Sequence, residues 1–267
     1  MTAKKNSMPI PWLVNYWKKA APAVLPFLRG RKVAIQQVFD KNILYRRHGA
    51  KGLPDKSGWI TLNTKSELLE WARLHTYSFH PHLKGDGDIW FVMDMDARTN
   101  KMFDLTKLAA FEMAKLLDKR KIKYLVKFSG NRGFHFMWNM GDVKPQWMKF
   151  RKQIRELAGE LETILQKKYA DKFYRLIPRK NPIIATSSTD RRLAKSILID
   201  EQIIHKNGMI RSPYSVHPGT GLVSVPLTGN KILKFNRDSA IPTKVKIHKI
   251  SLPVNLYSPK SALGVRA

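Results

Sequence analysis

Two acidic residues one position apart end a strongly apolar segment, Phe91-Val92-Met93-Asp94-Met95-Asp96. Side chains two apart on a strand share one face, so Asp94 and Asp96 would project together. Neighbouring carboxylates repel each other unless a positive group lies between them. Mg²⁺ or Mn²⁺ suits that place, because both accept oxygen ligands and leave positions for water and phosphates. The alternative is a pair of solvated acids at the end of a strand.

A glycine-containing turn, Ser129-Gly130-Asn131-Arg132-Gly133-Phe134-His135, connects two apolar segments. Gly130 and Gly133 allow backbone amides to turn inward, and such amides can cradle phosphate oxygens. His135 alternates with Phe134 and Phe136 along a strand, so its imidazole faces the opposite side and could donate a hydrogen bond to a triphosphate. An ordinary hairpin loop with a half-exposed histidine is the alternative.

Two later segments complete the set of chemically suggestive residues. Ile197-Leu198-Ile199 ends in Asp200, which is either a turn former or the third carboxylate of a site for two metal ions. The segment Arg211-Ser212-Pro213-Tyr214-Ser215-Val216-His217-Pro218-Gly219-Thr220-Gly221-Leu222 gathers arginine, serine and histidine in a turn. Arginine binds phosphate in a bidentate manner, so this segment reads as a phosphate clamp or, alternatively, as a rigid surface loop.

Charge and composition restrict the class of partner. The chain has 267 residues, with 49 Lys and Arg against 20 Asp and Glu, which gives a net charge of +29. The basic residues are spread along the chain, which favours nucleic acid as the partner. We find no basic amphipathic helix with an aromatic anchor and no lipidation motif, so we expect no membrane partner. A cytoplasmic location is expected, since neither a secretory signal nor a membrane-spanning run is found.

The absence of cysteine excludes several kinds of site. With no cysteine in the sequence there is no disulfide framework, no thiolate nucleophile and no cysteine-ligated zinc site. We therefore expect no zinc.

The hydrophobic patterns predict a mixed α and β fold, of the α+β type, with a central sheet flanked by helices. A capping box, Thr64-Lys65-Ser66-Glu67, predicts a helix through Tyr77, and a second helix is expected from about Asp104, its N-cap. A third helix follows Pro145. The predicted strands are Lys32 to Val38, Ile43 to Arg47, Trp59 to Leu62, Ile89 to Met95, Tyr124 to Phe128, Phe134 to Trp138, Ser196 to Ile199 and Leu222 to Pro226.

We expect one domain over residues 1–267, since no linker separates independent parts. It comprises an N-terminal α/β subdomain at about 12–80, a catalytic core at about 81–235 and a loosely packed tail at about 236–267, where proline and lysine accumulate.

Taken together and in this order, the four segments resemble the motifs of the archaeo-eukaryotic primase superfamily. Those motifs are D-x-D, S-G-x-x-G-x-H, a hydrophobic strand ending in Asp, and an R-x-P-x-S-x-H-x-x-T-G-L-type loop. Residues 21–31, followed by Trp59-Ile60 and Phe79-His80-Pro81, are similar to the polymerase domain of bacterial break-repair ligases and its archaeal relatives. The resemblance spans about residues 12–230.

The resemblance implies a primase-polymerase catalytic core. Asp94, Asp96 and Asp200 would be its catalytic metal ligands, for two Mg²⁺ or Mn²⁺ ions. The residues that would bind the incoming nucleoside triphosphate are Ser129, Gly130, Gly133, His135, Arg211, Ser215 and His217. The chain departs from the family in two ways. No cysteine or histidine lies between His135 and Asp200, so the zinc module of replicative small subunits is absent, and Gly219 stands where a lysine often precedes Thr-Gly.

The implied function is template-dependent addition of nucleotides to a 3′ hydroxyl, by a DNA-directed primase or polymerase. Its partners would be a DNA template with a DNA or RNA primer, and a ligase, an end-bridging protein or a replication protein. Two roles remain open, strand initiation in replication and gap filling in DNA end joining. A noncatalytic nucleic-acid-binding protein that retains the fold is the alternative from another class, and the complete acidic set argues against it.

Overall fold

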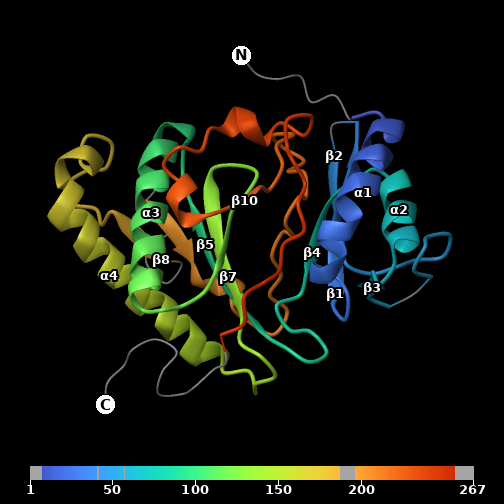
Figure 1. The fold of residues 1–267 in the computed structure, drawn as a ribbon, viewed down its shortest axis with the longest axis horizontal. Helices are drawn as coiled ribbons and strands as arrows, with labels where there is room; N and C mark the ends of the chain where they lie inside the picture. Colours follow the sequence, from blue (N-terminus) through green and yellow to red (C-terminus); the bar gives the residue numbers. More distant parts are fainter. Residues whose placement is uncertain (1–7, 41, 57, 187–195, 256–267) are drawn as a thin grey trace.

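Two sheets, each with helices packed on one face, make up the molecule, and an irregular segment runs between them (Figure 1). The computed structural model describes residues 8–40, 42–56, 58–186 and 196–255. None of the helices in these ranges is long and apolar enough to cross a membrane. The predicted mixed α+β class is confirmed. Short 3-10 turns also occur, at Leu25–Phe27, Asn100–Met102, Glu201–Ile203 (η3), Gly229–Lys231 and Arg237–Ala240.

The N-terminal sheet is antiparallel and has β1 at its centre. Apolar residues of β1, such as Val33 and Ile35, pack with Trp17 and Trp71 of the two helices that cover one face of the sheet. This core forms a hydrophobic cluster of its own. The elements are α1 (Ile10–Val24), β1 (Lys32–Phe39), β2 (Asn42–Arg46), β3 (Ile60–Thr61), α2 (Lys65–Arg73) and β4 (Thr76–Pro81).

The N-terminal helices differ from the sequence prediction in two respects. The capping box is present, with Thr64 and Glu67 bonded reciprocally, but α2 ends at Arg73 and not at Tyr77. His75 takes a φ of +57°, which breaks the helix and turns the chain into β4, where Tyr77 is buried. Sequence analysis assigned no helix to α1, although its Pro11 lies in the first turn, where a proline sacrifices no intrahelical hydrogen bond.

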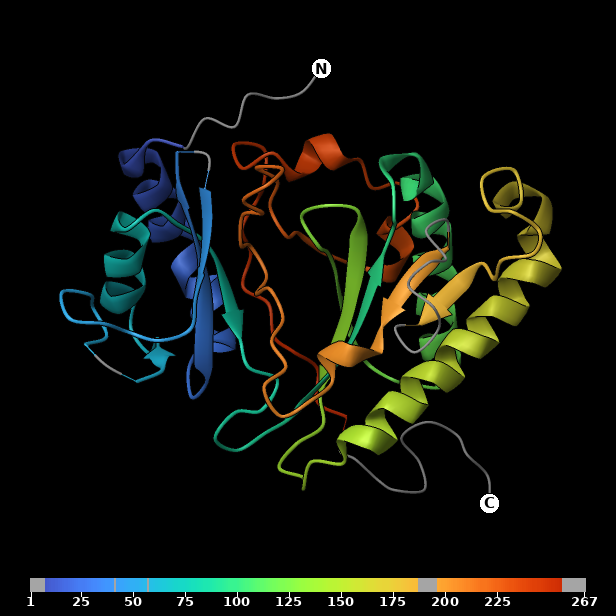
Figure 2. The ribbon, with the colours of Figure 1, turned by 180° about the vertical axis from the view of Figure 1, so that it is seen from behind.

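The second sheet has six strands in the order β10-β6-β7-β5-β9-β8. All pairs are antiparallel except β8 with β9, so the sheet is mixed. Helices α3 and α4 pack against its apolar residues, and α4 crosses the molecule diagonally in Figure 2. The bounds are β5 (Trp90–Asp96), α3 (Phe103–Lys119), β6 (Leu125–Phe128), β7 (Gly133–Asn139), α4 (Trp147–Phe173), β8 (Ile184–Thr186), β9 (Ile197–Asp200) and β10 (Pro226–Leu227).

Two boundaries predicted for this half are wrong. Asp104 is not the N-cap of α3, because the helix begins at Phe103 after Met102 and no side chain caps it. Asp104 instead lies in the first turn and pairs with Lys107 at 2.8 Å, where a carboxylate also interacts favourably with the helix dipole. The strand predicted from Leu222 to Pro226 is reduced to Pro226–Leu227, since most of that segment bonds to a neighbouring loop.

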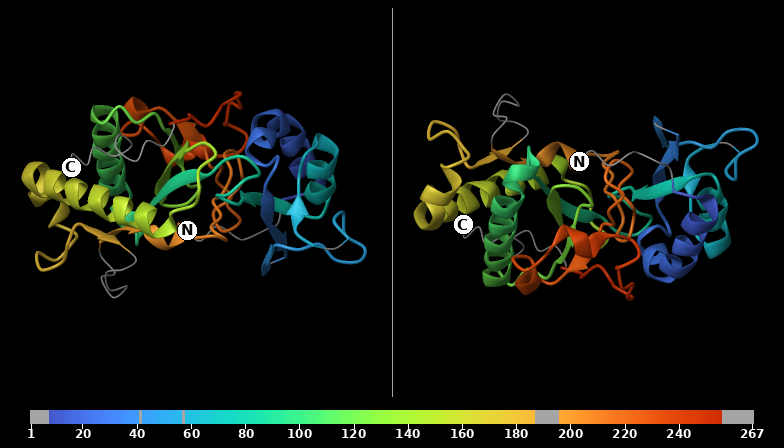
Figure 3. Two further views of the ribbon diagram at one scale, coloured as in Figure 1. Left: turned by 90° about the horizontal axis from the view of Figure 1, so that it is seen from below. Right: turned by 90° about the horizontal axis from the view of Figure 1, so that it is seen from above.

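The segment from Met209 to Val225 joins the two sheets. Its backbone amides at Ile210, Ser212 and Val216 donate to carbonyls of β4, at Pro81, Phe79 and Tyr77 respectively. At its other end the Val225 carbonyl accepts from Phe128 of β6. Both views of Figure 3 show this orange segment between the sheets, so residues that it carries lie close to strands of both.

Residues 241–255 follow without a helix or strand, beginning with a turn at 241–244, and 256–267 lie outside the described residues. The chain bonds to both halves of the molecule. The Tyr214 hydroxyl donates to the His248 carbonyl at 3.1 Å, and the Asn139 amide donates to the Pro253 carbonyl at 2.8 Å.

Candidate active site

The register of the central sheet brings the three predicted carboxylates to one place. Asp94 of β5 lies opposite His135 of β7 on one side and opposite Asp200 of β9 on the other. Asp96 lies two residues further along β5, on the same face. Directly opposed side chains have Cβ atoms about 4.5–5.5 Å apart. The grouping is thus a consequence of strand pairing across three strands.

Each of the three carboxylates has a contact through one oxygen. Asp94 Oδ1 lies 3.3 Å from His135 Nε2, and Asp96 Oδ2 lies 3.5 Å from Arg132 Nη2. Asp200 Oδ1 accepts from the Gln202 amide at 2.9 Å and so caps η3. In the described part of the chain, no three His, Cys, Asp or Glu side chains are close enough to hold a metal ion together. The Asp200 carboxylate is engaged in its cap instead.

The electrostatics of the acid pair fit a cation site. Burial, and then the neighbouring Asp94, raise the pKa of Asp96 to about 6. Burial also opposes the charge on Asp94, but His135 and then Lys127 outweigh it and lower the pKa of that carboxyl. Two neighbouring carboxylates are difficult to ionise together, and a divalent cation bound between them removes this repulsion. The donors at Asp94 and Asp96, all hard oxygens, therefore fit Mg²⁺ or Mn²⁺.

The turn from Ser129 to Gly133 requires both of its glycines. Gly130 takes a φ of +91°, which disfavours any residue with a Cβ. A Cβ on Gly133 would lie 2.0 Å from the Met95 carbonyl oxygen of β5, so only glycine allows the two strands to approach. Inside the turn, Ser129 Oγ accepts from the Asn131 and Gly133 amides at 3.3 and 3.2 Å. The hydroxyl thus fixes the inward-turned amides.

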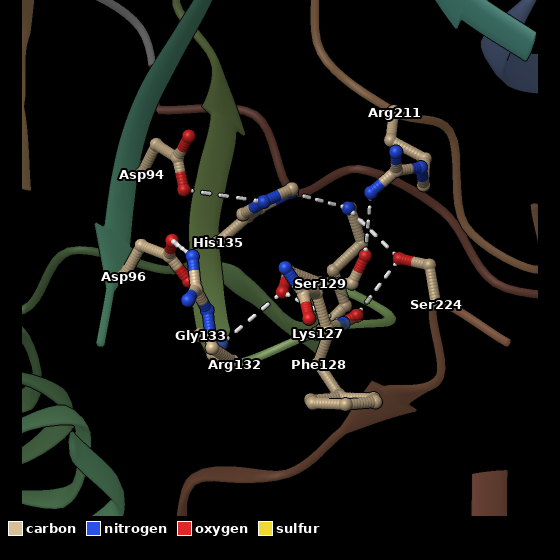
Figure 4. A network of polar contacts seen from close by, with 11 residues as sticks. Asp94, Asp96, Lys127, Phe128, Ser129, Arg132, Gly133, His135, Arg211 and Ser224 are labelled. Carbon is tan, nitrogen blue, oxygen red and sulfur yellow. Dashed lines mark hydrogen bonds and ion pairs between the residues drawn. The ribbon is translucent and has the colours of Figure 1, made fainter. Parts of the chain in front are cut away.

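A buried lysine that sequence analysis did not select lies at the centre of the site. Lys127 of β6 is fully buried, and its Nζ lies 2.5 Å from His135 Nδ1 and donates to Ser224 Oγ at 3.0 Å (Figure 4). Burial, and then the nearby Arg211, lower the pKa of Lys127 well below its ordinary value, and Asp94 partly offsets them. A lysine within the otherwise apolar Leu125–Phe128 strand, directly before the glycine turn, was the available signal.

His135 connects Lys127 to the acid pair. It is 4% exposed, and both of its ring nitrogens face partners within the site, Asp94 at Nε2 and Lys127 at Nδ1. Burial, and then Lys127, lower the pKa of His135 to about 4, so the ring is neutral near pH 7. With Lys127 donating to Nδ1, the ring proton is on Nε2 and is donated to Asp94.

Arg211 crosses the gap between the two sheets. Its Nε donates to Ser78 Oγ at 3.0 Å, Nη1 to the Ser129 carbonyl at 2.9 Å and Nη2 to Gln36 Oε1 at 3.1 Å. Burial lowers its pKa to about 10, so the guanidinium stays charged at neutral pH. These bonds use three of its five N–H donors, and the other two can bind an anion.

His80 of β4 is another site residue that no sequence motif assigned a role. Its Nε2 lies 2.9 Å from Ser78 Oγ and 3.1 Å from Gln36 Oε1, the two side chains that also bind Arg211. Burial, and then Arg211, lower its pKa well below the ordinary value. The N-terminal sheet therefore supplies one wall of the site, which only the tertiary structure shows.

The last two predicted nucleotide ligands take different positions. Ser215 is fully buried and bonds to the backbone amide of Phe79 at 3.1 Å, so its hydroxyl anchors the loop to β4. His217 is half-buried, and its Nδ1 accepts from the Gly219 and Thr220 amides at 3.1 and 3.2 Å. Burial, and then Arg211, lower the pKa of His217 to about 3, so the neutral ring carries its proton on Nε2.

Comparisons with known proteins identify the fold and the family of the chain. The polymerase domain from Mycobacterium tuberculosis Ligase D, solved in complex with DNA, matches with a TM-score of 0.67 and 15% sequence identity, covering 91% of this chain and 92% of that one. None of the curated protein sequences matches the chain. The family model for the LigD primase-polymerase domain matches residues 12–250. The chain therefore belongs to the LigD primase-polymerase domain family.

Proposed function

We propose that the protein is a template-directed nucleotidyltransferase that fills gaps during DNA end joining. The reaction is attack of a strand's 3′ hydroxyl on the α-phosphate of a nucleoside triphosphate, with pyrophosphate leaving. The observation that carries the proposal is the acid pair Asp94 and Asp96 facing a wall of basic groups at His135, Lys127 and Arg211 (Figure 4). Family membership supports a repair nucleotidyltransferase, and we assign gap filling over strand initiation on that basis.

In this proposal Asp94, Asp96 and Asp200 hold divalent cations, Mg²⁺ or Mn²⁺. When bound, such ions activate the hydroxyl and neutralise charge that develops on the phosphates. Asp200 accepts from the Gln202 amide through Oδ1, so its other oxygen, Oδ2, is the one that it offers to a cation. His135 donates its Nε2 proton to Asp94, which orients that carboxylate.

The basic residues hold the triphosphate. Arg211 is fixed by three hydrogen bonds and can offer its two remaining N–H groups, one from each Nη, to phosphate oxygens. His217 can add a neutral donor through Nε2, because its Nδ1 is occupied by backbone amides. Prepositioned donors of this kind stabilise a reacting phosphate without reorganising during the reaction.

The test is extension of a labelled primer on a gapped DNA duplex, with Mg²⁺ or Mn²⁺ and nucleoside triphosphates. We expect extension with at least one metal, none with a chelator, and none for Asp94→Asn. Asp171→Asn removes an exposed carboxylate from α4 and should extend like wild type. A noncatalytic binding protein would show no extension with either metal, and extension by Asp94→Asn would refute the assignment of the acid pair. Products made on unprimed template would indicate strand initiation.

A further inference from the structure

One face of the N-terminal sheet continues from the candidate active site toward solvent. Strand alternation places Gln36 of β1 and His80 of β4 on the side that meets Arg211. The same alternation puts Lys32 and His82 on this face, farther along the two strands, where the His82 amide donates to the Lys32 carbonyl. Lys32 is exposed, so the face reaches the surface.

A tryptophan lies at the outer end of this face. Trp59 forms an antiparallel bridge with His48, and their rings lie 4.5 Å apart. His82 packs edge-on at 4.8 Å from Trp59, and the Lys32 ammonium lies 4.9 Å from the centre of the indole. His82 is only 4% exposed, whereas Trp59 is half-buried and both His48 and Lys32 are exposed. Trp59 thus packs against one buried histidine and lies at the surface beside two exposed residues.

Two basic residues lie near this ring. Lys32 lies over the indole, and Arg47 directly precedes His48, with its carbonyl accepting from the Ile60 amide at 3.1 Å. Burial, and then Lys32, lower the pKa of His82 to about 4. Arg47 is exposed, and its guanidinium lies 5.4 Å from the ring of Tyr45. Tyr45 in turn packs at 5.7 Å from His80, so aromatic and basic groups continue from the site outward.

We propose that the surface formed by Lys32, Arg47, His48 and Trp59 binds unpaired template strand, with a base stacked on Trp59 and phosphates on the two cations. That the bound strand is a template rests on the proposed function. Bases of a single strand expose their faces, whereas those of a duplex are stacked internally, so a half-buried indole beside basic residues at the surface suits a single strand. Stacking accepts any base, so binding should not depend on sequence.

The test is fluorescence anisotropy of a labelled oligothymidine with the full chain, without metal or nucleotide. Trp59→Leu keeps the apolar bulk but removes the ring, and we expect it to weaken binding by at least about fivefold. Trp59→Phe keeps a ring and should retain most of the affinity. Phe39→Leu is the matched control, because it removes an aromatic ring from the same subdomain, at the end of β1 and outside this surface, where Phe39 is 42% exposed. Thermal melting checks that each variant is folded.

The roles of Lys32 and Arg47 are tested by the salt dependence of single-strand binding. Each phosphate contact to a single strand contributes about 0.7 to the slope of log affinity against log salt, so Lys32→Gln and Arg47→Gln should each reduce the slope by about 0.7. Lys119→Gln removes an exposed charge from the end of α3, in the other half of the molecule, and should leave the slope unchanged (Figure 1).

Unchanged affinity of folded Trp59→Leu for oligothymidine would overturn the proposal, as would an equal loss of affinity for a blunt duplex. Because this titration needs no catalysis, it is independent of the primer assay. If wild type fails to extend primers but Trp59→Leu loses single-strand binding, the gap-filling function fails and the binding surface stands. If wild type extends primers and Trp59→Leu binds normally, the surface is wrong and the function stands.

Discussion

Replacing Arg211 separates its role in the fold from its role in binding nucleotide. Arg211→Met keeps the aliphatic stem and removes the guanidinium with its bonds to Ser78, Ser129 and Gln36. Arg211→Lys keeps the charge but cannot reproduce the planar fork. The balance between desolvation of the charge and these three bonds decides how much stability is lost.

The two opposing contributions of Arg211 nearly cancel. Its pKa falls to about 10 from 12.5, which means that burying the charge costs up to about 3 kcal/mol, less where water screens it. Three hydrogen bonds contribute about 1 kcal/mol each. The net effect of the substitution is therefore set by the Ser129 carbonyl, which loses its hydrogen-bond donor. Arg211→Met should lower the free energy of unfolding by about 1–3 kcal/mol. A domain of ordinary stability would remain folded.

Nucleotide binding should suffer far more than folding. Charge-assisted bonds to phosphate contribute about 1.5–3 kcal/mol each, so two of them correspond to a loss of about 100-fold or more in kcat/KM for the nucleotide. Arg211→Lys should recover only part of it. Arg29→Met is the control, since Arg29 is exposed and its side chain donates to the Asn63 carbonyl, outside the site.

The measurements are urea unfolding and steady-state kinetics with nucleotide varied at saturating primed template. A kcat/KM within threefold of wild type would refute the nucleotide role of Arg211. A variant that is unfolded without urea would show that the cancellation of the two contributions is wrong.

Three further predictions follow from the geometry. The raised pKa of Asp96 means that the folded state binds the extra proton, so metal-free wild type should lose stability as pH rises from about 4 to about 6. Asp96→Asn should remove this pH-dependent loss of stability, which we expect to be about 1 kcal/mol because the side chain is 35% exposed. Thermal melts across pH measure it, and a pH profile equal to that of wild type would refute the prediction. Lys127→Met leaves His135 Nδ1 without its partner, so primer extension should fall at least about tenfold. The free energy of unfolding should change by less than about 2 kcal/mol. Wild-type activity would contradict this positioning role of Lys127. Gly133→Ala must displace β5 and should lower the free energy of unfolding by more than about 2 kcal/mol. Gly159→Ala places a methyl group in open space on α4 and should raise that free energy by about 0.5–1 kcal/mol. Urea unfolding measures both, and equal effects would show that the contact between strands is not the cause.

The sequence alone was sufficient for features that depend on local pattern. The apolar run from Ile89 to Met95 predicted the strand that the structure has at Trp90–Asp96, and the two-residue spacing predicted the shared face of Asp94 and Asp96. The capping box at Thr64 predicted the start of α2. The family resemblance is confirmed by the match over residues 12–250, and the turn from Ser129 to Gly133 lies between two strands as predicted. The catalytic and nucleotide-binding roles of these residues stay predictions.

Local pattern gave less about where elements end. Prolines at the N-terminus obscured α1, although a proline in the first turn of a helix is tolerated. The helix at Thr64 ends early because His75 leaves the helical region, a choice that burial of the next strand against β1 imposes.

Tertiary structure alone decided which distant segments share the site. Asp94 lies beside Asp200 and His135 because β5 pairs with both β9 and β7, and strand order is not encoded by the period of any one strand. Lys127 is tolerated in the core because His135 and Ser224, from other segments, satisfy its ammonium. Arg211 meets the N-terminal sheet only because the Met209 to Val225 segment bonds along β4. The sequence determined the chemical groups and their local geometry, whereas long-range strand pairing and the burial of polar side chains determined which of them meet.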